Sequence, residues 1–307
     1  MLNDFVTSLS SGEIELFEDS GPTTMLVKQG ATQAHVRGQD PDDFPAISPD
    51  GGNGTTFSVD AGDLREAIGQ VCFLPRRMIL ARYSRGPRRR VKDRRFPCCC
   101  RRIPMSFRQV SMAAELPEDI SIVVPARSMQ EVGRILSDSQ EAAEIRITPN
   151  QAQMIVEVPD VTLVTRLIDG TFPDLQQIIP QNWNTRSVVS RDVLLDATRR
   201  AAIFARSNND VIKFALDPSD GSEGIGRLTI TATAADTGDN RDELDAQIEG
   251  SELEVAFNGR YLTDLLSVLD SPSVALELQG PNAAGVFRPV DDDNFVHVIM
   301  PMVIGAN

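Results

Sequence analysis

Apolar and polar positions along this chain form a block that recurs four times. In each block a short β-rich run is followed by a small or polar break and then by an amphipathic helix. The β-rich runs end at Val59, Val124, Val189 and Phe257, at intervals of 65, 65 and 68 residues. Three nearly equal intervals indicate an architectural period rather than coincidence.

Each predicted helix carries apolar residues at spacings of three and four, which is typical of one buried face. These residues are Leu64, Ala67, Ile68 and Val71; Met129, Val132 and Leu136; Val193, Ala197, Ala201 and Phe204; and Leu262, Leu265, Leu266 and Leu269. Residues 144–158, 162–170, 226–236 and 273–280 alternate with a period of two, which predicts half-buried antiparallel strands. The expected fold is α+β, with repeated half-domains of one helix on antiparallel strands.

A longer period overlies the short one. Asp-Phe-Pro at 43–45 and Thr-Phe-Pro at 171–173 are 128 residues apart, about two short repeats. One domain is therefore two helices backed by two small sheets. We expect such domains at 55–181 and at 185–307.

Residues 1–50 are interpreted as the C-terminal half of a further domain. Leu2, Phe5, Val6 and Leu9 have the spacing of a repeat helix, but the strand that should precede it is missing. We expect an N-terminal truncation of about half a domain. A natural short first domain is the alternative.

Residues 74–105 depart from the composition of the rest of the chain. This segment concentrates arginine and Cys98, Cys99 and Cys100 in an otherwise acidic protein. A basic nucleic-acid patch would need interleaved aromatic residues and a stable element beneath it. A zinc site would need spaced cysteines and partner ligands.

A local reading-frame error is the favoured interpretation of this segment. Shifted codons recode Arg77–Ser84 as Asp-Asp-Thr-Arg-Pro-Val-Phe and Arg102–Met105 as Asp-Ser-Tyr, which are ordinary soluble-protein sequences. Both flanks, up to Phe73 and from Phe107, stay in pattern. The nucleotide sequence of the gene tests this interpretation.

Composition sets the broad class of protein. A chain of 307 residues with 41% hydrophobic residues can form two or three domains. The net charge of −14 argues against holding nucleic acid by bulk attraction, but it allows a locally basic surface. There is no apolar run of about 18 residues or more, no secretion signal and no spaced cysteine framework, so we expect a cytoplasmic protein with no membrane span.

Catalytic chemistry is not indicated. No Ser/His/Asp, Cys/His or paired-carboxylate arrangement stands out, and the chain has two histidines. No phosphate-binding glycine loop occurs. A metal-dependent nucleic-acid enzyme centred on Asp236–Asp245 and Asp291–Asn294 is the alternative from another class, although Asp236–Asp245 is better interpreted as an exposed loop. We expect no catalytic residue, no metal and no cofactor.

Two apolar segments that contain proline each close a structural unit. They are Leu167–Pro180, LIDGTFPDLQQIIP, and Val298–Met302, VIMPM. Together they could form a surface groove for a partner. The alternative is that they are ordinary core at a domain junction.

These two segments, PDDFPAI at 41–47 and the 65-residue period resemble the bacterial sliding clamp family, the β subunit of DNA polymerase III. The resemblance covers nearly the whole chain apart from the unusual segment. It implies three such domains per subunit and two subunits closed head to tail into a homodimeric ring, with helices lining the hole and sheets outside. Such a ring slides on duplex DNA and tethers the polymerase without catalysing a reaction.

The resemblance also implies site residues and partners. A groove for short linear motifs of the polymerase α subunit, the clamp loader, other polymerases and repair proteins would be lined by Pro173, Gln177, Ile178, Val298, Met300, Pro301 and Met302. The cations facing DNA would be Arg65, Arg127, Arg134, Arg191, Arg199 and Arg260. The subunit interface would use Ile203 and Phe204, against a first domain in which Ala34 stands where a large apolar residue is expected.

The unusual segment bears on this resemblance. The family carries an Arg-Pro-Val-like strand after the first helix of the middle domain and later an Ala-x-Asp-x-(Tyr/His)-Arg-Leu turn. The chain as written lacks both, and the recoded segment restores parts of them. A damaged gene product that acts as a peptide-binding module without forming a ring is therefore a further alternative.

Overall fold

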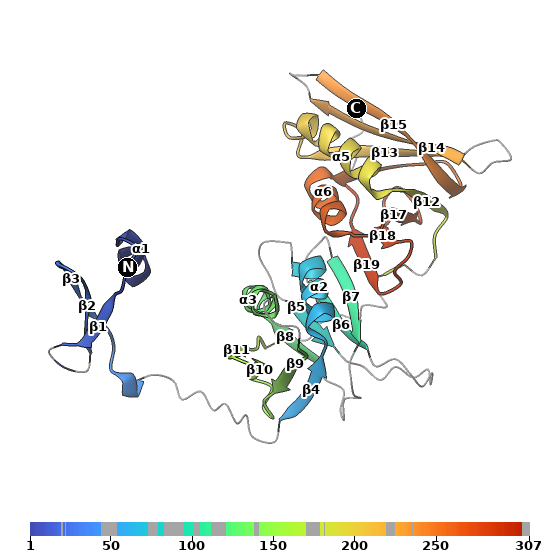
Figure 1. The fold of residues 1–307 in the computed structure, drawn as a ribbon. Helices are drawn as coiled ribbons and strands as arrows, with labels where there is room; N and C mark the ends of the chain where they lie inside the picture. The colour runs from blue at the N-terminus through green and yellow to red at the C-terminus, as the bar shows by residue number, and fades with distance from the viewer. Residues whose placement is uncertain are drawn as a thin grey trace. The chain divides into compact units, whose positions relative to one another are not determined.

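The computed structural model describes residues 1–19, 21, 23–43, 54–72, 79–82, 95–100, 105–111, 121–137, 141–169, 179–180, 182–218, 225–234, 236 and 238–302. The chain divides into two compact units, residues 1–50 and residues 51–307 (Figure 1). In the part of the chain that is described, every helix is too short or too polar to cross a membrane.

The first unit is a small helix-and-sheet element. It contains α1 (Leu2–Ser8), β1 (Glu15–Glu18), β2 (Thr24–Gln29), β3 (Thr32–Arg37) and the 3-10 helix η1 (Pro41–Asp43). The strands form an antiparallel sheet in the order β1-β2-β3. The helix expected near residues 2–9 is present as α1. Val27 of β2 is fully buried.

The second unit begins with two helices and their strands. Its elements are β4 (Thr55–Val59), α2 (Ala61–Cys72), β5 (Ile79–Arg82), β6 (Arg95–Cys100), β7 (Met105–Ser111), β8 (Ser121–Val124), α3 (Ala126–Leu136), β9 (Ala143–Ile147), β10 (Gln153–Val158) and β11 (Val161–Arg166). Helices α2 and α3 pack side by side (Figure 1). Their apolar faces share one core with the sheet β11-β10-β9-β4.

The C-terminal part repeats this plan. It contains β12 (Thr185–Ser190), α5 (Arg191–Ala205), β13 (Val211–Asp217), β14 (Ile225–Ala234), β15 (Gly238–Gly250), β16 (Leu253–Asn258), α6 (Gly259–Val268), β17 (Ser273–Leu278), β18 (Gly285–Pro289) and β19 (Phe295–Ile299). Helices α5 and α6 pack together over a second core. The predicted α+β fold of helices on antiparallel strands is confirmed.

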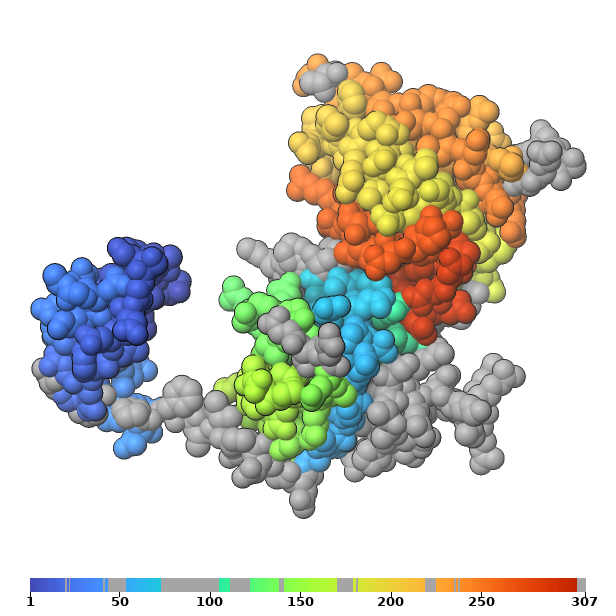
Figure 2. Space-filling model, in the orientation of Figure 1, coloured from blue at the N-terminus to red at the C-terminus, as the bar shows by residue number. Residues whose placement is uncertain are grey.

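One sheet links the two halves of the second unit. Its strand order is β16-β13-β14-β15-β12-β17-β18-β19-β7-β6-β5-β8. The link is the antiparallel pair β19–β7, which joins the last described strand to the strand that begins at Met105. Figure 2 shows the red surface of the C-terminal strands against the cyan surface of α2.

The predicted buried helix faces are correct in three of the four repeats. All the residues expected on the inner faces of α2, α3 and α6 are buried. In α5 the prediction was wrong at Val193, which is 47% exposed, while Leu194 and Leu195 are buried instead. Ala197 and Ala201 are buried as predicted, so the buried face of α5 is only shifted toward Leu194 and Leu195, and Phe204 is partly buried at its edge.

The interpretation of Asp236–Asp245 as a loop was wrong. Most of these residues lie in β15, which pairs with β14 and β12. Two of its carboxylates pair with arginines on neighbouring elements: Arg200 of α5 contacts Asp242 at 2.8 Å, and Arg227 of β14 contacts Glu243 at 2.9 Å. The hydrogen bond from Arg200 holds the pKa of Asp242 below its usual value. These ion pairs offset part of the repulsion between the acidic residues of the strand.

Two strands form within the unusual segment 74–105. The backbone of β5 pairs with β6 and with β8. A strand is thus present after α2 although the sequence expected for it is missing, since the main-chain hydrogen bonds of a ladder do not require that particular sequence. The reading-frame interpretation stays a prediction.

Phe257 tests the C-terminal core. Its ring is fully buried between Phe214 and Phe287, with ring centroids 5.8 Å and 5.6 Å away. Phe257→Ala should lower the free energy of unfolding by about 3–5 kcal/mol, because it removes apolar contacts and leaves a cavity. Val193→Ala is the control, with an expected change within about 0.5 kcal/mol. Urea unfolding followed by the fluorescence of Trp183, the one tryptophan, measures both. An equal loss of unfolding free energy in Phe257→Ala and Val193→Ala would contradict the placement of this core.

Candidate partner-binding site

The antiparallel strand pair β7–β19 supports the candidate site. Its register sets Met105 opposite Val298, Ser106 opposite His297, Phe107 opposite Val296 and Arg108 opposite Phe295. Side chains alternate between the two faces of a strand pair. One face therefore carries four apolar residues, and the other carries Ser106, Arg108 and His297 together with Phe295.

The apolar face holds a small cluster separate from the two main cores. This seam cluster consists of the buried residues Phe107, Val123, Val286, Val296 and Val298, with Met105, Ile179 and Ala284 partly buried against it. Val298 is 2% exposed, so its side chain forms a floor and does not line an open surface.

The chain continues from this floor to an exposed methionine. Met300 is 43% exposed, while Pro301 and Met302 are half-buried. The backbone N–H of Met302 donates to the carbonyl of Ala256 at 2.8 Å, which holds the end of this segment against β16. A buried valine followed by a projecting methionine offers an apolar contact on a fixed backbone. The predicted groove residues Pro173, Gln177 and Ile178 lie outside the described residues.

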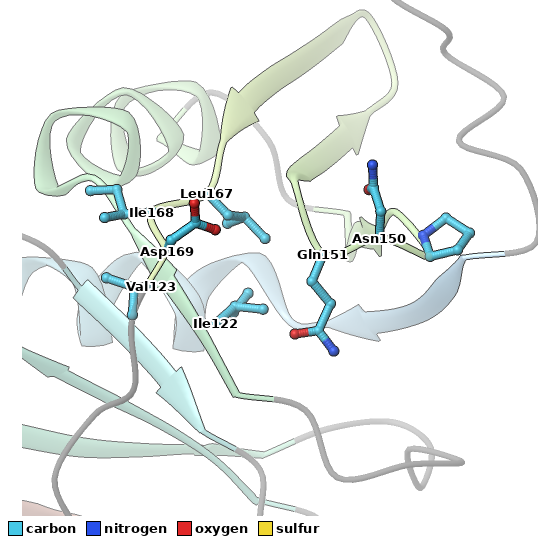
Figure 3. A pocket seen from close by; sticks show the side chains of 8 residues that line it. Ile122, Val123, Asn150, Gln151, Leu167, Ile168 and Asp169 are labelled. Atoms are coloured by element: carbon cyan, nitrogen blue, oxygen red, sulfur yellow. The ribbon is translucent and has the colours of Figure 1, made fainter.

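A hollow of about 380 Å³ adjoins this surface (Figure 3). It is lined by Ile122, Val123, Pro149, Asn150, Gln151, Leu167, Ile168 and Asp169. Val123 belongs to both the hollow and the seam cluster. Figure 3 shows Asn150 and Gln151 on the side opposite Ile168 and Asp169.

Backbone hydrogen bonds fix the start of the segment LIDGTFPDLQQIIP at this hollow. The N–H of Ile168 donates to the carbonyl of Val123 at 2.8 Å, and that of Leu167 donates to Ala152 at 2.8 Å. Val123 and Met105 were not predicted to line this site, whereas Ile179 belongs to the predicted segment LIDGTFPDLQQIIP. The signal for Val123 and Met105 was weak, because each is a single apolar residue within a strand.

The opposite face of the β7–β19 pair is closed and combines Phe295 of the C-terminal core with polar residues. The Ser106 Oγ and His297 Nδ1 atoms lie 2.6 Å apart, and both residues are fully buried. Burial lowers the pKa of His297 to about 3, so its imidazole is neutral near pH 7. Arg108 of β7 contacts Glu66 of α2 at 2.9 Å and also pairs with Asp292, which precedes β19. Polar contacts thus join β7 to both helix α2 and the C-terminal half.

The six arginines predicted to face DNA lie on or beside the repeat helices. Arg65, Arg127, Arg134, Arg199 and Arg260 are exposed, and Arg191 is partly buried at the start of α5. Four of the six are ion-paired within the chain: Arg134 with Glu131, Arg191 with Asp192, Arg199 with Asp196, and Arg260 with Asp210.

The predicted subunit-interface residues lie near the end of α5. Ile203 is 63% exposed, and Phe204 is partly buried against the C-terminal core. Ala34, on β3 of the first unit, is half-buried. Among the described side chains, no group of three or more His, Cys, Asp or Glu residues is arranged to hold a metal ion.

Comparison with known proteins identifies the family. The family model for the DNA polymerase III beta subunit, C-terminal domain, matches residues 176–303, and the model for its central domain matches residues 98–174. The second match begins inside the unusual segment. The two matches together span more than half of the chain, and the chain belongs to the DNA polymerase III β subunit family.

Individual relatives agree with this assignment. The Beta sliding clamp of Staphylococcus epidermidis is 25% identical over 302 residues, which cover 97% of this chain and 77% of the relative. That of Staphylococcus aureus is 23% identical over 301 residues, with the same coverage.

Solved structures share the fold. The DNA polymerase sliding clamp of Bacillus subtilis superimposes with a TM-score of 0.82 at 22% identity, covering 99% of this chain and 78% of that one. The DNA polymerase III β subunit of Thermotoga maritima gives 0.81 at 22% identity, covering 99% of this chain and 80% of that one.

The buried His297 predicts a pH dependence of stability. Its pKa is about 3 in the folded protein and near 6.5 in the unfolded chain, so the unfolded chain binds an extra proton between these values. Stability is complete above pH about 6.5 and falls with acidification, by up to about 1.4 kcal/mol per pH unit.

His297→Gln should remove this part of the pH slope. The measurement is urea unfolding in the first pH unit below about 6.5, followed by Trp183 fluorescence. His35→Gln, in the other unit, is the control and should keep the wild-type slope. An unchanged slope in His297→Gln would show that this histidine is not buried as a neutral group.

Proposed function

We infer that this protein is a DNA sliding clamp, a non-catalytic subunit that encircles duplex DNA and tethers the replicative polymerase for processive synthesis. The observation that carries this inference is that family similarity and fold similarity both extend over nearly the whole chain. The repeated helix-on-sheet plan supports it, because such repeats can place helices on one side and sheets on the other.

The proposed division of the chain follows the repeats. Residues 1–50 are the C-terminal half of a first clamp domain, residues 55–181 are the second domain and residues 185–307 are the third. Two pairs of packed helices, α2 with α3 and α5 with α6, support the last two. The strand pair β7–β19 joins these domains edge to edge.

The partner groove lies on the apolar face of that strand pair. Pro173, Gln177, Ile178, Val298, Met300, Pro301 and Met302 line or support it, and the partly buried Met105 and Ile179 extend it. Methionine is flexible and polarizable, so Met300 and Met302 can adapt to different apolar anchors. The proline ring of Pro301 restricts the local backbone, so this part of the groove loses little conformational entropy when a peptide binds.

The partners of the groove are short linear motifs in the polymerase α subunit, the clamp loader, other polymerases and repair proteins. The protein works in the cytoplasm, on duplex DNA and without reading its sequence. Long arginine side chains on the helices contact phosphate, which gives weak and salt-sensitive binding. An acidic net charge elsewhere discourages DNA from binding outside the hole.

Two copies close the ring head to tail. The exposed Ile203 and the adjacent Phe204 contact the first domain of the second copy, where Ala34 offers a smaller apolar surface than a large side chain would. Ile203 and Phe204 are adjacent apolar residues at the end of α5, and burying them against a second copy would remove apolar surface from water. The small partner residue predicts a weak interface.

Peptide binding tests the groove. A fluorescent peptide of the type Gln-x-x-Leu-Phe should bind the wild-type protein, and Met300→Ala should weaken binding about tenfold or more, because an apolar anchor loses its contact. Fluorescence anisotropy measures both. Ile225→Ala, which truncates an apolar residue that is 51% exposed on β14, is the control and should bind like wild type.

Two outcomes would count against the groove. One is the absence of binding by a wild-type protein shown to be folded by circular dichroism. The other is equal affinity for wild type and Met300→Ala, which would place the peptide elsewhere on the protein.

A further inference from the structure

Helix α3 presents two arginines in closely similar positions. Arg127 and Arg134 are seven residues apart, which places them two turns apart on the same stripe. Both are exposed, opposite the buried Met129, Val132 and Leu136. Both side chains leave the helix in nearly the same direction. If one of them can contact the phosphates of a duplex in the hole, the other is oriented to do so as well.

The two arginines differ in their electrostatic surroundings. The Arg134 Nε atom lies 2.9 Å from the Glu131 carboxylate, one turn before it. Across the residues that the structure describes, Arg127 has no carboxylate within ion-pair distance. The stripe therefore carries one arginine with an acidic partner and one without such a partner among the described residues.

The same division extends to the other helices. Arg191 lies 2.8 Å from Asp192, Arg260 lies 2.9 Å from Asp210, and Arg199 lies 3.8 Å from Asp196. Arg65 of α2 resembles Arg127, because it is exposed and has no acidic partner among the described residues. The neighbouring Glu66 is instead bonded to Arg108 and Gln70.

A paired arginine is a poor ligand for phosphate. The carboxylate already neutralises the guanidinium, so a phosphate gains little long-range attraction and meets a nearby negative charge. A free arginine attracts phosphate and releases the counterions condensed on the DNA. Pairing therefore removes most of the contribution of an arginine to DNA contact.

We propose that Arg65 and Arg127 are the phosphate-contacting residues among the six helix arginines, and that Glu131, Asp192, Asp196 and Asp210 suppress the other four. This inference rests on the proposed function, because it assumes that DNA passes the helices. It explains how a clamp can contact DNA without binding it tightly. Two arginines contact phosphate, and the other four are neutralised by carboxylates of the same chain.

Matched variants on α3 test the proposal. The measurement is the anisotropy of a labelled duplex over a series of salt concentrations. Arg127→Gln should weaken binding and lower the slope of log affinity against log salt by about 0.9 for each lost contact. Arg134→Gln should leave both quantities unchanged. Glu131→Gln should raise affinity and the slope, because it frees Arg134; a merely structural role would not produce that gain.

The outcomes separate this inference from the proposed function. Equal weakening by Arg127→Gln and Arg134→Gln, or no gain from Glu131→Gln, would overturn the inference while leaving DNA contact by the helices intact. A wild-type protein that is folded and shows no salt-dependent affinity for duplex would contradict helix-mediated DNA contact itself, and the inference with it. Thermal melting of each variant verifies that it is folded.

Discussion

The antiparallel pairing of β7 with β19 is the constraint on which the rest of the second unit depends. It joins residues 105–108 to residues 295–298 and so makes one continuous sheet from strands of two structural repeats. Because side chains alternate across a strand pair, the same few residue pairs determine both faces. One face becomes the floor of the candidate groove, and the other carries the closed contact between Ser106 and His297.

This arrangement couples the partner site to the packing of the two halves. Val298 in the groove floor neighbours His297, and Arg108 lies one residue from Phe107 of the seam cluster. A change that opens the polar face would displace the apolar face as well, since both belong to the same two strands. The exposed Met300 then extends from a fixed base, which suits recognition of short peptides by one adaptable side chain.

The repeat period predicted the helices, the antiparallel strands and the fold class, because these depend on local spacing of apolar residues. It failed at Val193, where two adjacent stripes of α5 are both apolar and the position of the sheet decides which one is buried. It failed at β15, where Asp242 and Glu243 pair with Arg200 and Arg227 from other elements. The seam contacts could not be predicted, since Ser106 and His297 are 191 residues apart in sequence.

The central claim is that the protein encircles DNA. The most direct measurement loads it onto nicked circular duplex with the clamp loader and ATP and then follows co-elution with the DNA in gel filtration, before and after the circle is cut once. A topological ring predicts that the protein stays with the circle and is released from the linear product. Equal retention on both DNA forms, or no association of the folded protein with the circle, would contradict the account.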